Sequence, residues 1–287
     1  MRIAIVSDVH ANLAALEAVL RHAQAPGPID GIWCLGDTVG YGPQPSQCVA
    51  RLREAGATLV AGNHDRAATG KMGTEEFNPD AATAALWTRD HLEDAAAYLD
   101  SLPEVARASA AQGRPDRIGA PPEKGRSAGL KAAPPETELN AGPKPGAHAE
   151  EFTLVHGTLR WPLWEYLYSY EAARAHLERQ ETPFSLVGHT HVPMLVAEGA
   201  EFEHGCEMYY LEDGGSVPLT EERRLVVNPG GVGQPRDGDP RAAYAIYDTD
   251  ARTVTVHRVE YDIGATQALM EAAGLPRRLI DRLAVGR

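Results

Sequence analysis

Five short segments carry side chains suited to binding metal ions. They are Asp8-Val9-His10, Gly36-Asp37, Gly62-Asn63-His64-Asp65, His156-Gly157 and Gly188-His189-Thr190-His191. A mixture of imidazole, carboxylate and amide ligands suits Mn, Fe, Zn, Co or Ni better than Ca or Mg, which prefer oxygen alone. If Asp37 bridges two ions, seven side chains supply four protein ligands to each. The candidate ligands are Asp8, His10, Asp37, Asn63, His156, His189 and His191.

The chemistry expected of such a site is phosphoryl transfer. Two metal ions about 3.5 to 4 Å apart polarise phosphoryl oxygens, lower the pKa of a bridging water and stabilise the attacking and leaving oxygens. A metal-bridging hydroxide is the predicted nucleophile. His64 is the predicted catalytic residue, which either protonates the leaving oxygen or stabilises developing charge. Asp65 either orients His64 or closes the turn.

The elements that must position these residues are strands followed by polar turns. Apolar runs predict strands over 3–8, 31–37 and 57–63, separated by helices near 12–24 and 46–55, which is typical of βαβ units. Such sheets bind ligands beyond the carboxyl ends of their strands. Extended backbone directs residues i and i+2 to the same side, so we expect Asp8 with His10, and His189 with His191, to aim at one place.

Further along the chain, the pattern predicts a helical region from 80 to 101, a strand near 104–109, a helix near 171–181 and a strand at 184–191. Later segments (MYYLED, RLVVNPGG, AAYAIYD and TVTVHRVEY) indicate antiparallel strands, and two helices close the chain. The predicted fold class is therefore α/β, a four-layer sandwich of two mixed β-sheets flanked by α-helices.

The segment from Ala110 to Glu150 differs from the rest in composition. It holds six Gly, seven Pro and nine Ala, with no aromatic residue. Such a composition buries too little apolar surface to offset chain entropy, so it predicts a flexible insertion. The flanking runs PEVARAS and EEFTLVHG are then expected to be two strands of one hairpin, within a single domain over residues 1–287.

Charge and composition limit the classes of binding partner that we expect. A formal net charge of -13 argues against a broad nucleic-acid surface or attraction to anionic lipid. The apolar N-terminal run is too short for a secretory signal or a membrane span, so the expected location is the cytoplasm. Three cysteines without a CxxC pair indicate neither a zinc knuckle nor a disulfide framework. The expected partner is a small phosphorylated substrate, with a nucleotide as one candidate. The sequence leaves the oligomeric state open.

Taken in order, the motifs resemble the calcineurin-like metallophosphoesterase family, whose pattern is D-x-H, G-D, G-N-H-D/E, H and G-H-x-H. The resemblance implies the two-sheet sandwich and places the metal site on strand-end loops. It assigns one metal to Asp8, His10, Asp37 and His191, and the other to Asp37, Asn63, His156 and His189. It also implies that His64 is the catalytic histidine. Manganese is the metal expected first, with Fe, Ni, Co or Zn as alternatives.

One departure from the family pattern bears on the substrate. Protein Ser/Thr phosphatases of this family have G-D-x-x-D-R-G, whereas this chain has Gly36-Asp37-Thr38-Val39-Gly40-Tyr41-Gly42. A protein phosphatase is therefore disfavoured. The compact chain resembles the small prokaryotic phosphodiesterase branch, so phosphodiester hydrolysis is the leading prediction. The alternatives are a phosphomonoesterase or nucleotidase, a dinucleotide polyphosphate hydrolase, and a non-catalytic scaffold like the retromer subunit that shares the fold.

Two further segments leave alternatives open. Gln234 and Arg236 either contact a phosphate, for which Arg is well suited, or belong to a solvated glycine-rich turn. Trp161, Trp164 and the tyrosines between 166 and 170 either line the pocket and stack on a nucleobase or pack in a core or dimer face.

Overall fold

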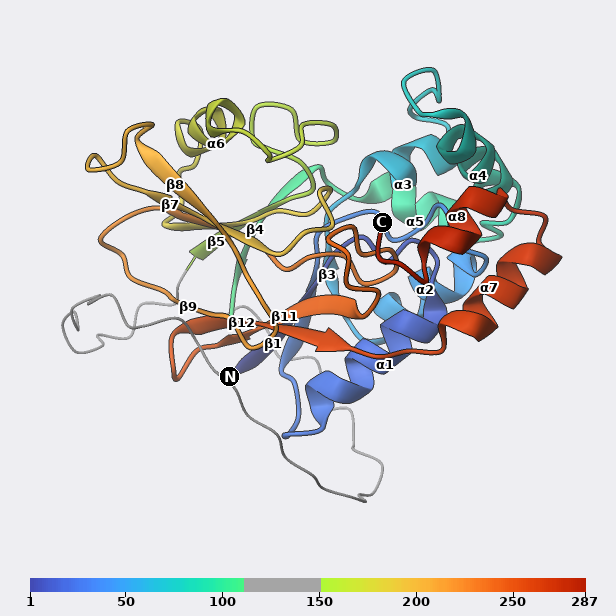
Figure 1. The fold of residues 1–287 in the computed structure, drawn as a ribbon, viewed down its shortest axis with the longest axis horizontal. Coiled ribbons are helices and arrows are strands. Elements are labelled where there is room, and N and C mark those ends of the chain that lie inside the picture. Colours follow the sequence, from blue (N-terminus) through green and yellow to red (C-terminus); the bar gives the residue numbers. More distant parts are fainter. Residues whose placement is uncertain (111–150) are drawn as a thin grey trace.

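Strands of both orientations build two mixed six-stranded sheets in this computed structural model, which describes residues 1–110 and 151–287 (Figure 1). In spatial order, the first sheet comprises β3 (Thr58–Leu59), β2 (Gly31–Cys34), β1 (Arg2–Val6), β11 (Ala242–Asp248), β12 (Thr253–Val259) and β9 (Ser216–Pro218). The second comprises β4 (Val105–Ser109), β5 (Glu151–Val155), β6 (Phe184–Leu186), β10 (Leu225–Asn228), β7 (Met194–Glu198) and β8 (Cys206–Tyr210). The prediction of an α/β fold with two mixed sheets is confirmed.

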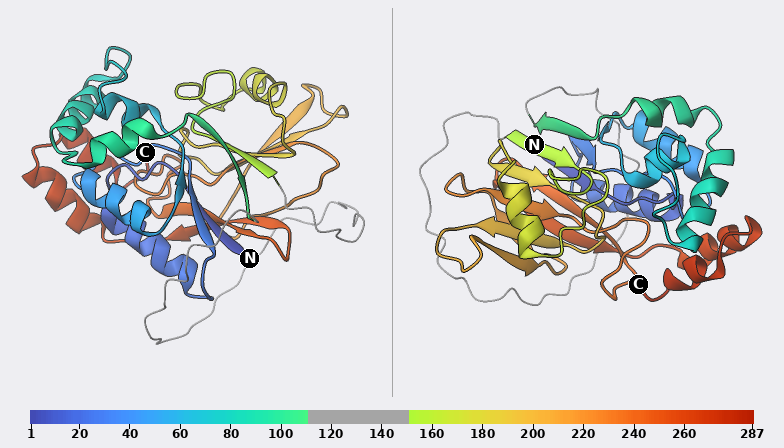
Figure 2. Two further views of the ribbon diagram at one scale, coloured as in Figure 1. Left: turned by 180° about the vertical axis from the view of Figure 1, so that it is seen from behind. Right: turned by 90° about the horizontal axis from the view of Figure 1, so that it is seen from above.

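Eight helices lie among the described parts of the chain. They are α1 (Leu13–Gln24), α2 (Pro45–Glu54), α3 (Asn63–Ala68), α4 (Pro79–Asp90), α5 (Ala95–Ser101), α6 (Tyr170–Leu177), α7 (Ile263–Ala272) and α8 (Arg277–Arg282). Helices α1, α2 and α5 pack on the first sheet, and α6 covers the outer face of the second (Figures 1 and 2). None of them is long and apolar enough to cross a membrane.

Alternating side chains of β1 explain the layering. Ala4 and Val6 face the helices, whereas Ile3 and Ile5 face the second sheet. Both faces of this strand are buried, which accounts for its nearly continuous apolar run. Between the sheets, the Trp33 ring on the first lies 5.2 Å from the Phe152 ring on the second. Full burial of one such side chain stabilises the fold by about 1.5 to 3 kcal/mol.

Strand direction decides where the functional loops gather. In the first sheet β1, β2 and β3 run parallel, and in the second β5, β6 and β10 do so. Six parallel strands therefore bring their carboxyl ends to one side of the molecule. Asn12, which caps α1, donates from Nδ2 to the carbonyl of Gly233 at 3.0 Å and so connects the loop after β1 with the loop after β10.

Several local predictions need correction. The predicted helical region from 80 to 101 is two helices, α4 and α5, because the chain turns at Glu93 with φ of 49°. The predicted strand at 57–63 is only β3, since Asn63 begins α3. Strands β7 and β9 were not predicted. The predicted pairing of the strands that flank the insertion is correct, because β4 and β5 are antiparallel. The predicted flexibility of 110–150 concerns a segment that, except for Ala110, lies outside the described residues.

Candidate metal centre

All seven predicted ligands meet at the carboxyl ends of the parallel strands. The first sheet supplies four of them from the loops after β1, β2 and β3, and the second sheet supplies three from the loops after β5 and β6. The four are Asp8, His10, Asp37 and Asn63; the three are His156, His189 and His191. All seven are buried. Residues far apart in sequence are therefore neighbours because of strand order.

The backbone at this site is more strained than the sequence suggested. Asp8, His10, Asp37, His189 and His191 have φ of 53°, 47°, 50°, 64° and 59°. The pairs at i and i+2 do not converge through extended backbone, as we expected, but through left-handed turns. Such conformations cost L-residues about 1 to 2 kcal/mol each, and strain of this kind clusters at functional sites.

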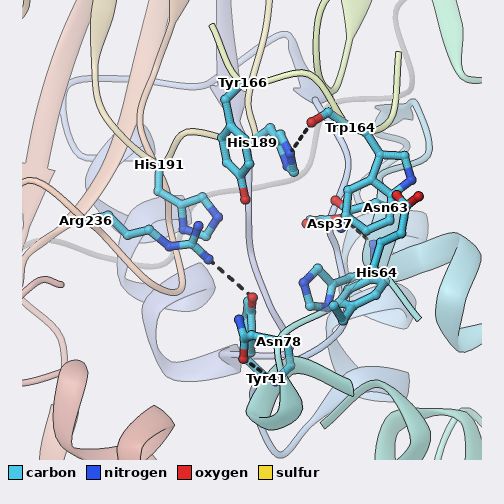
Figure 3. A pocket seen from close by; sticks show the side chains of 13 residues that line it. Asp37, Tyr41, Asn63, His64, Asn78, Trp164, Tyr166, His189, His191 and Arg236 are labelled. Atoms are coloured by element: carbon cyan, nitrogen blue, oxygen red, sulfur yellow. Dashed lines mark hydrogen bonds between the residues drawn. The ribbon is translucent and has the colours of Figure 1, made fainter. Parts of the chain in front are cut away.

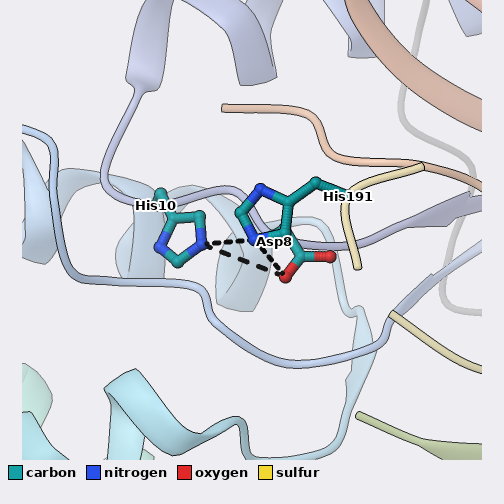
Figure 4. Close-up of side chains that lie close together, drawn as sticks. All are labelled: Asp8, His10 and His191. Carbon is teal, nitrogen blue, oxygen red and sulfur yellow. Dashed lines mark hydrogen bonds and ion pairs between the residues drawn. The ribbon is translucent and has the colours of Figure 1, made fainter. Parts of the chain in front are cut away.

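One group of ligand atoms comprises Asp8 Oδ1 and the Nε2 atoms of His10 and His191 (Figure 4). The two Nε2 atoms lie 3.2 Å apart, and that of His191 lies 3.1 Å from Asp8 Oδ1. His10 Nδ1 bonds to the Val39 carbonyl at 3.1 Å, and His191 Nδ1 to the Gln234 carbonyl at 2.5 Å. Because a carbonyl can only accept, both Nδ1 atoms carry the proton, and in the neutral rings both Nε2 atoms present lone pairs.

A second group is built in the same way around His156. Its Nε2 lies 3.1 Å from His189 Nδ1 and 3.2 Å from Asn63 Oδ1. The other ring nitrogens, His156 Nδ1 and His189 Nε2, bond to the carbonyls of Leu35 at 2.8 Å and Trp164 at 3.1 Å. In the neutral rings, the nitrogens of this group that face one another therefore also present lone pairs.

Asp37 joins the two groups. Its Oδ2 lies 3.3 Å from His156 Nε2 and 3.7 Å from His10 Nε2. Asp8 Oδ1 is buried without a hydrogen-bond partner. Acceptors crowded in this way, two of them carboxylates, require positive charge between them. Two divalent cations fit this donor set, and the four carbonyl-bonded imidazoles have the ring orientation that metal-bound histidines show.

The pKa values reflect the same crowding. Burial lowers the pKa of His10, His189 and His191, which keeps their lone pairs available. Burial acts in the same direction on His156, but the adjacent Asp37 carboxylate raises the pKa of this imidazole to about 9. The centre therefore attracts positive charge most strongly next to Asp37.

Gly62 allows the loops after β2 and β3 to meet. A Cβ at this position would lie 2.0 Å from Asp37 Oδ1. Asp65 then connects the loops, because its carboxylate accepts from Gly62 N at 2.9 Å and from Val39 N at 3.2 Å. Of the two roles considered for Asp65, the structure thus shows that it closes the turn, with no hydrogen bond to the His64 ring among the described residues.

His64 lies beside the ligand groups. Its backbone N donates to Asp37 Oδ1 at 2.9 Å, and its ring packs against Tyr41 at 4.3 Å and Phe77 at 4.8 Å. Burial lowers the pKa of His64 to about 4, so the ring is neutral near pH 7. Nδ1 is buried without a partner, directly against Gly40. A neutral ring can donate one N–H to a substrate oxygen.

A cavity of about 80 Å³ opens next to the ligand groups, with room for a phosphoryl group (Figure 3). His64 and Tyr41 lie on one side of it, Trp164 and Tyr166 on another, and Arg236 faces them. Tyr166 stacks on His189 with ring centroids 3.9 Å apart.

The sequence left two possible roles for several residues, and only some of these residues line the cavity. Of the aromatic segment, Trp164 and Tyr166 line the cavity, whereas Trp161 is 61% exposed. Arg236 lines the cavity, and Gln234 acts through its backbone carbonyl on His191. The lining residues that were not predicted from the sequence include Glu76, Phe77 and Asn78, which immediately precede α4 and belong to no motif.

Comparison with known proteins agrees with this architecture. A crystal structure of a metallophosphoesterase from Sphaerobacter thermophilus is 41% identical, with a TM-score of 0.75, and the alignment covers 100% of this chain and 99% of that one. An uncharacterized protein of Methanocaldococcus jannaschii is 33% identical over 99% of this chain and 98% of its own length. A symmetrical bis(5'-nucleosyl)-tetraphosphatase of Psychromonas ingrahamii is 40% identical over 63 residues, which are 21% of this chain and 23% of that protein.

The family model for the calcineurin-like phosphoesterase superfamily domain matches residues 1–252. This range contains the five motif segments and both sheets up to β11. The chain belongs to the calcineurin-like phosphoesterase family.

Proposed function

We propose that this protein is a dinuclear metal-dependent phosphodiesterase. The observation that carries the proposal is the pair of lone-pair groups joined by Asp37 beside a cavity of phosphoryl size. One metal would be held by Asp8, His10, Asp37 and His191, and the other by Asp37, Asn63, His156 and His189. When bound, the two ions would supply Lewis-acid activation of the phosphoryl group and of a water nucleophile.

The chain's own residues orient and stabilise the reacting groups. Backbone carbonyls fix four imidazoles, so the ligands require little rearrangement. His64 donates a hydrogen bond to charge that develops on the leaving oxygen. Because the ring is neutral near pH 7, stabilisation of charge is better supported than donation of a proton from an imidazolium.

The preference for diesters rests on the second motif. Gly40 and Tyr41 stand where protein phosphatases of the family have Asp and Arg. A Cβ at Gly40 would clash with the His64 ring, and Tyr41 packs against this ring. Trp164 and Tyr166 add aromatic surface for an ester substituent. Manganese as the native metal and the cytoplasm as the location remain predictions from the sequence.

The first experiment measures metal stoichiometry and turnover together. Chelator-treated protein is titrated with Mn²⁺, and hydrolysis of bis(p-nitrophenyl) phosphate is compared with that of p-nitrophenyl phosphate. We expect two equivalents of metal, turnover that depends on them, and faster cleavage of the diester. Metal-loaded protein that cleaves neither compound would contradict the proposal and favour a scaffold.

Similarity to the tetraphosphatase supports one second candidate, a dinucleotide polyphosphate hydrolase, although it covers only 63 residues. The same metal-loaded protein is therefore assayed with dinucleotide polyphosphates, cyclic nucleotides and nucleoside monophosphates. A value of kcat/KM at least tenfold higher for a dinucleotide polyphosphate than for any simple diester would replace the leading proposal with this one.

A further inference from the structure

Arg236 belongs to the loop that follows β10, the sixth parallel strand. The other five parallel strands each lead into a loop that carries predicted metal ligands. The loop after β10 carries none of the seven, but it brings the Arg236 side chain to the cavity wall opposite His64 (Figure 3). The topology thus gives all six strand ends a place at the same site.

The guanidinium of Arg236 is held by neutral groups only. Its Nη2 donates to Gln234 Oε1 at 3.2 Å and to Tyr41 Oη at 3.4 Å. Within residues 1–110 and 151–287, no carboxylate lies within ion-pair distance of Arg236, whereas the partly buried Arg224 and the buried Arg258 each have one. The positive charge of Arg236 is therefore partly buried without a neighbouring anion to neutralise it.

One donor of the Arg236 side chain has no partner among the residues that the structure describes. Arg236 Nε is buried and has no hydrogen-bond partner. The guanidinium also hydrogen-bonds to the Tyr166 side chain, which lines the same cavity, so the donor that remains without a partner is Nε. Because guanidinium has five N–H groups in a planar fork, it suits two oxygens of one phosphate.

A second arginine increases the positive field at this wall. Burial, together with the nearby charge of Arg236, lowers the pKa of Arg282 on α8 to about 10. Arg282 Nε donates to the backbone oxygen of Arg287. The neighbouring charge of Arg282 adds to the positive field that Arg236 places at the cavity, and this field favours the binding of an anion there.

We propose that Arg236 binds the substrate phosphate, its guanidinium contacting the nonbridging oxygens from the cavity wall while Tyr41 and Gln234 hold the group in place. This inference rests on the proposed function. It identifies the substrate class as esters whose scissile phosphate is anionic and selects against neutral phosphotriesters.

The test uses inorganic phosphate as the probe and compares Arg236→Gln, Arg236→Lys and a control, Arg241→Gln. Arg241 lies on the same loop but is paired with Asp239 and Asp213. Calorimetric titration of phosphate into metal-loaded protein should give a Kd about 10- to 100-fold weaker for Arg236→Gln, the loss expected for charged hydrogen bonds. Arg236→Lys should lose less, and Arg241→Gln should match the wild type. Metal content should stay the same in all four proteins.

Kinetics separate this inference from the proposed function. In the diester assay, Arg236→Gln should raise KM and lower kcat, because the phosphate is held both before and during reaction. If the wild type binds phosphate through Arg236 but hydrolyses no ester, the inference stands and the proposed function fails. If turnover and phosphate affinity are unchanged in Arg236→Gln, or if the wild type does not bind phosphate, the inference is wrong. Arg236→Lys gives the same comparison if the glutamine variant does not fold.

Discussion

Gly40 offers a direct test of how the chain positions His64. This glycine has φ of +90°, and a Cβ built on it would lie 2.4 Å from His64 Nδ1. That separation is 1.0 Å below the 3.4 Å at which ordinary contact begins. The ring cannot retreat freely, because it packs against Tyr41 and Phe77. Gly40→Ala should therefore displace His64 from its place in the cavity.

The expected loss in the free energy of unfolding of Gly40→Ala has two parts. A left-handed alanine costs about 1 to 2 kcal/mol, and overpacking of a buried site costs about 1 to 3 kcal/mol more. Gly214→Ala is the matched control, since Gly214 has φ of +81° and nothing within 4 Å of its built Cβ. The control should show only the first part of the loss in the free energy of unfolding.

Turnover should separate the two variants more sharply than stability. Positioned hydrogen-bond or acid–base groups contribute about 10²- to 10⁴-fold to rate. Gly40→Ala should lose at least 10²-fold in kcat on bis(p-nitrophenyl) phosphate, whereas Gly214→Ala should retain wild-type kcat. Both should keep two equivalents of metal, measured by elemental analysis, because none of the proposed ligands is replaced.

The effects of Gly40→Ala and His64→Ala on kcat should be non-additive. If Gly40→Ala acts through His64, adding it to His64→Ala should lower kcat no further, because the ring is already absent. Equal kcat for Gly40→Ala and the wild type would refute the steric argument. A further loss in the double variant would show that Gly40 acts on another part of the site.

Three further predictions concern the metal centre and the core. Asp37→Asn should lower kcat about 10²- to 10³-fold, as expected when an electrostatic group of the reacting centre is lost, and should reduce bound metal from two equivalents, whereas Asp239→Asn, on the loop after β10, should change neither. Removal of metal by a chelator should lower the melting temperature, since a ligand at 100 times its Kd stabilises the native state by about 2.7 kcal/mol per site; an unchanged melting temperature would contradict the assignment of the lone-pair groups. His176 is buried, accepts from Leu159 N and has a pKa lowered to about 3 by burial. Below pH of about 6.5 the unfolded chain gains a proton that native His176 does not, so the free energy of unfolding should fall by about 1.4 kcal/mol per pH unit from this residue. Urea unfolding of His176→Gln between pH 6.5 and 5 should show a flatter dependence than the wild type and than the exposed-site control His204→Gln.

The sequence predicted the fold where the local pattern and the tertiary environment agree. β1 and β2 were identifiable because their apolar runs are buried on both faces and end in polar turns. β9 was missed because it is only three residues long, Ser216–Pro218, and α3 because it is a six-residue helix that begins inside a ligand motif. Elements this short depend on their neighbours for stability rather than on their own periodicity.

The ligand set could be proposed from residue types, but its geometry could not. The groups that orient the imidazoles are the backbone carbonyls of Leu35, Val39, Trp164 and Gln234. Every residue has a carbonyl, so no side-chain pattern marks these positions. The left-handed turns could not be predicted either, because Asp and His are enriched at positive φ but only a small fraction of such residues adopt it.

The strained backbone at the metal centre is what crowds the acceptor side chains together. Left-handed turns bring side chains such as Asp8 and His191 closer together than extended strand ends would, and the carbonyl bonds then direct their lone pairs inward. Each strained turn costs about 1 to 2 kcal/mol, which is considerable when a whole domain is stable by about 5 to 15 kcal/mol. The parallel strands must hold these turns in place before any cation binds. The strained turns therefore lower the stability of the fold but keep the ligands close together. Binding of a cation, rather than a rearrangement of the protein, then relieves the repulsion between them.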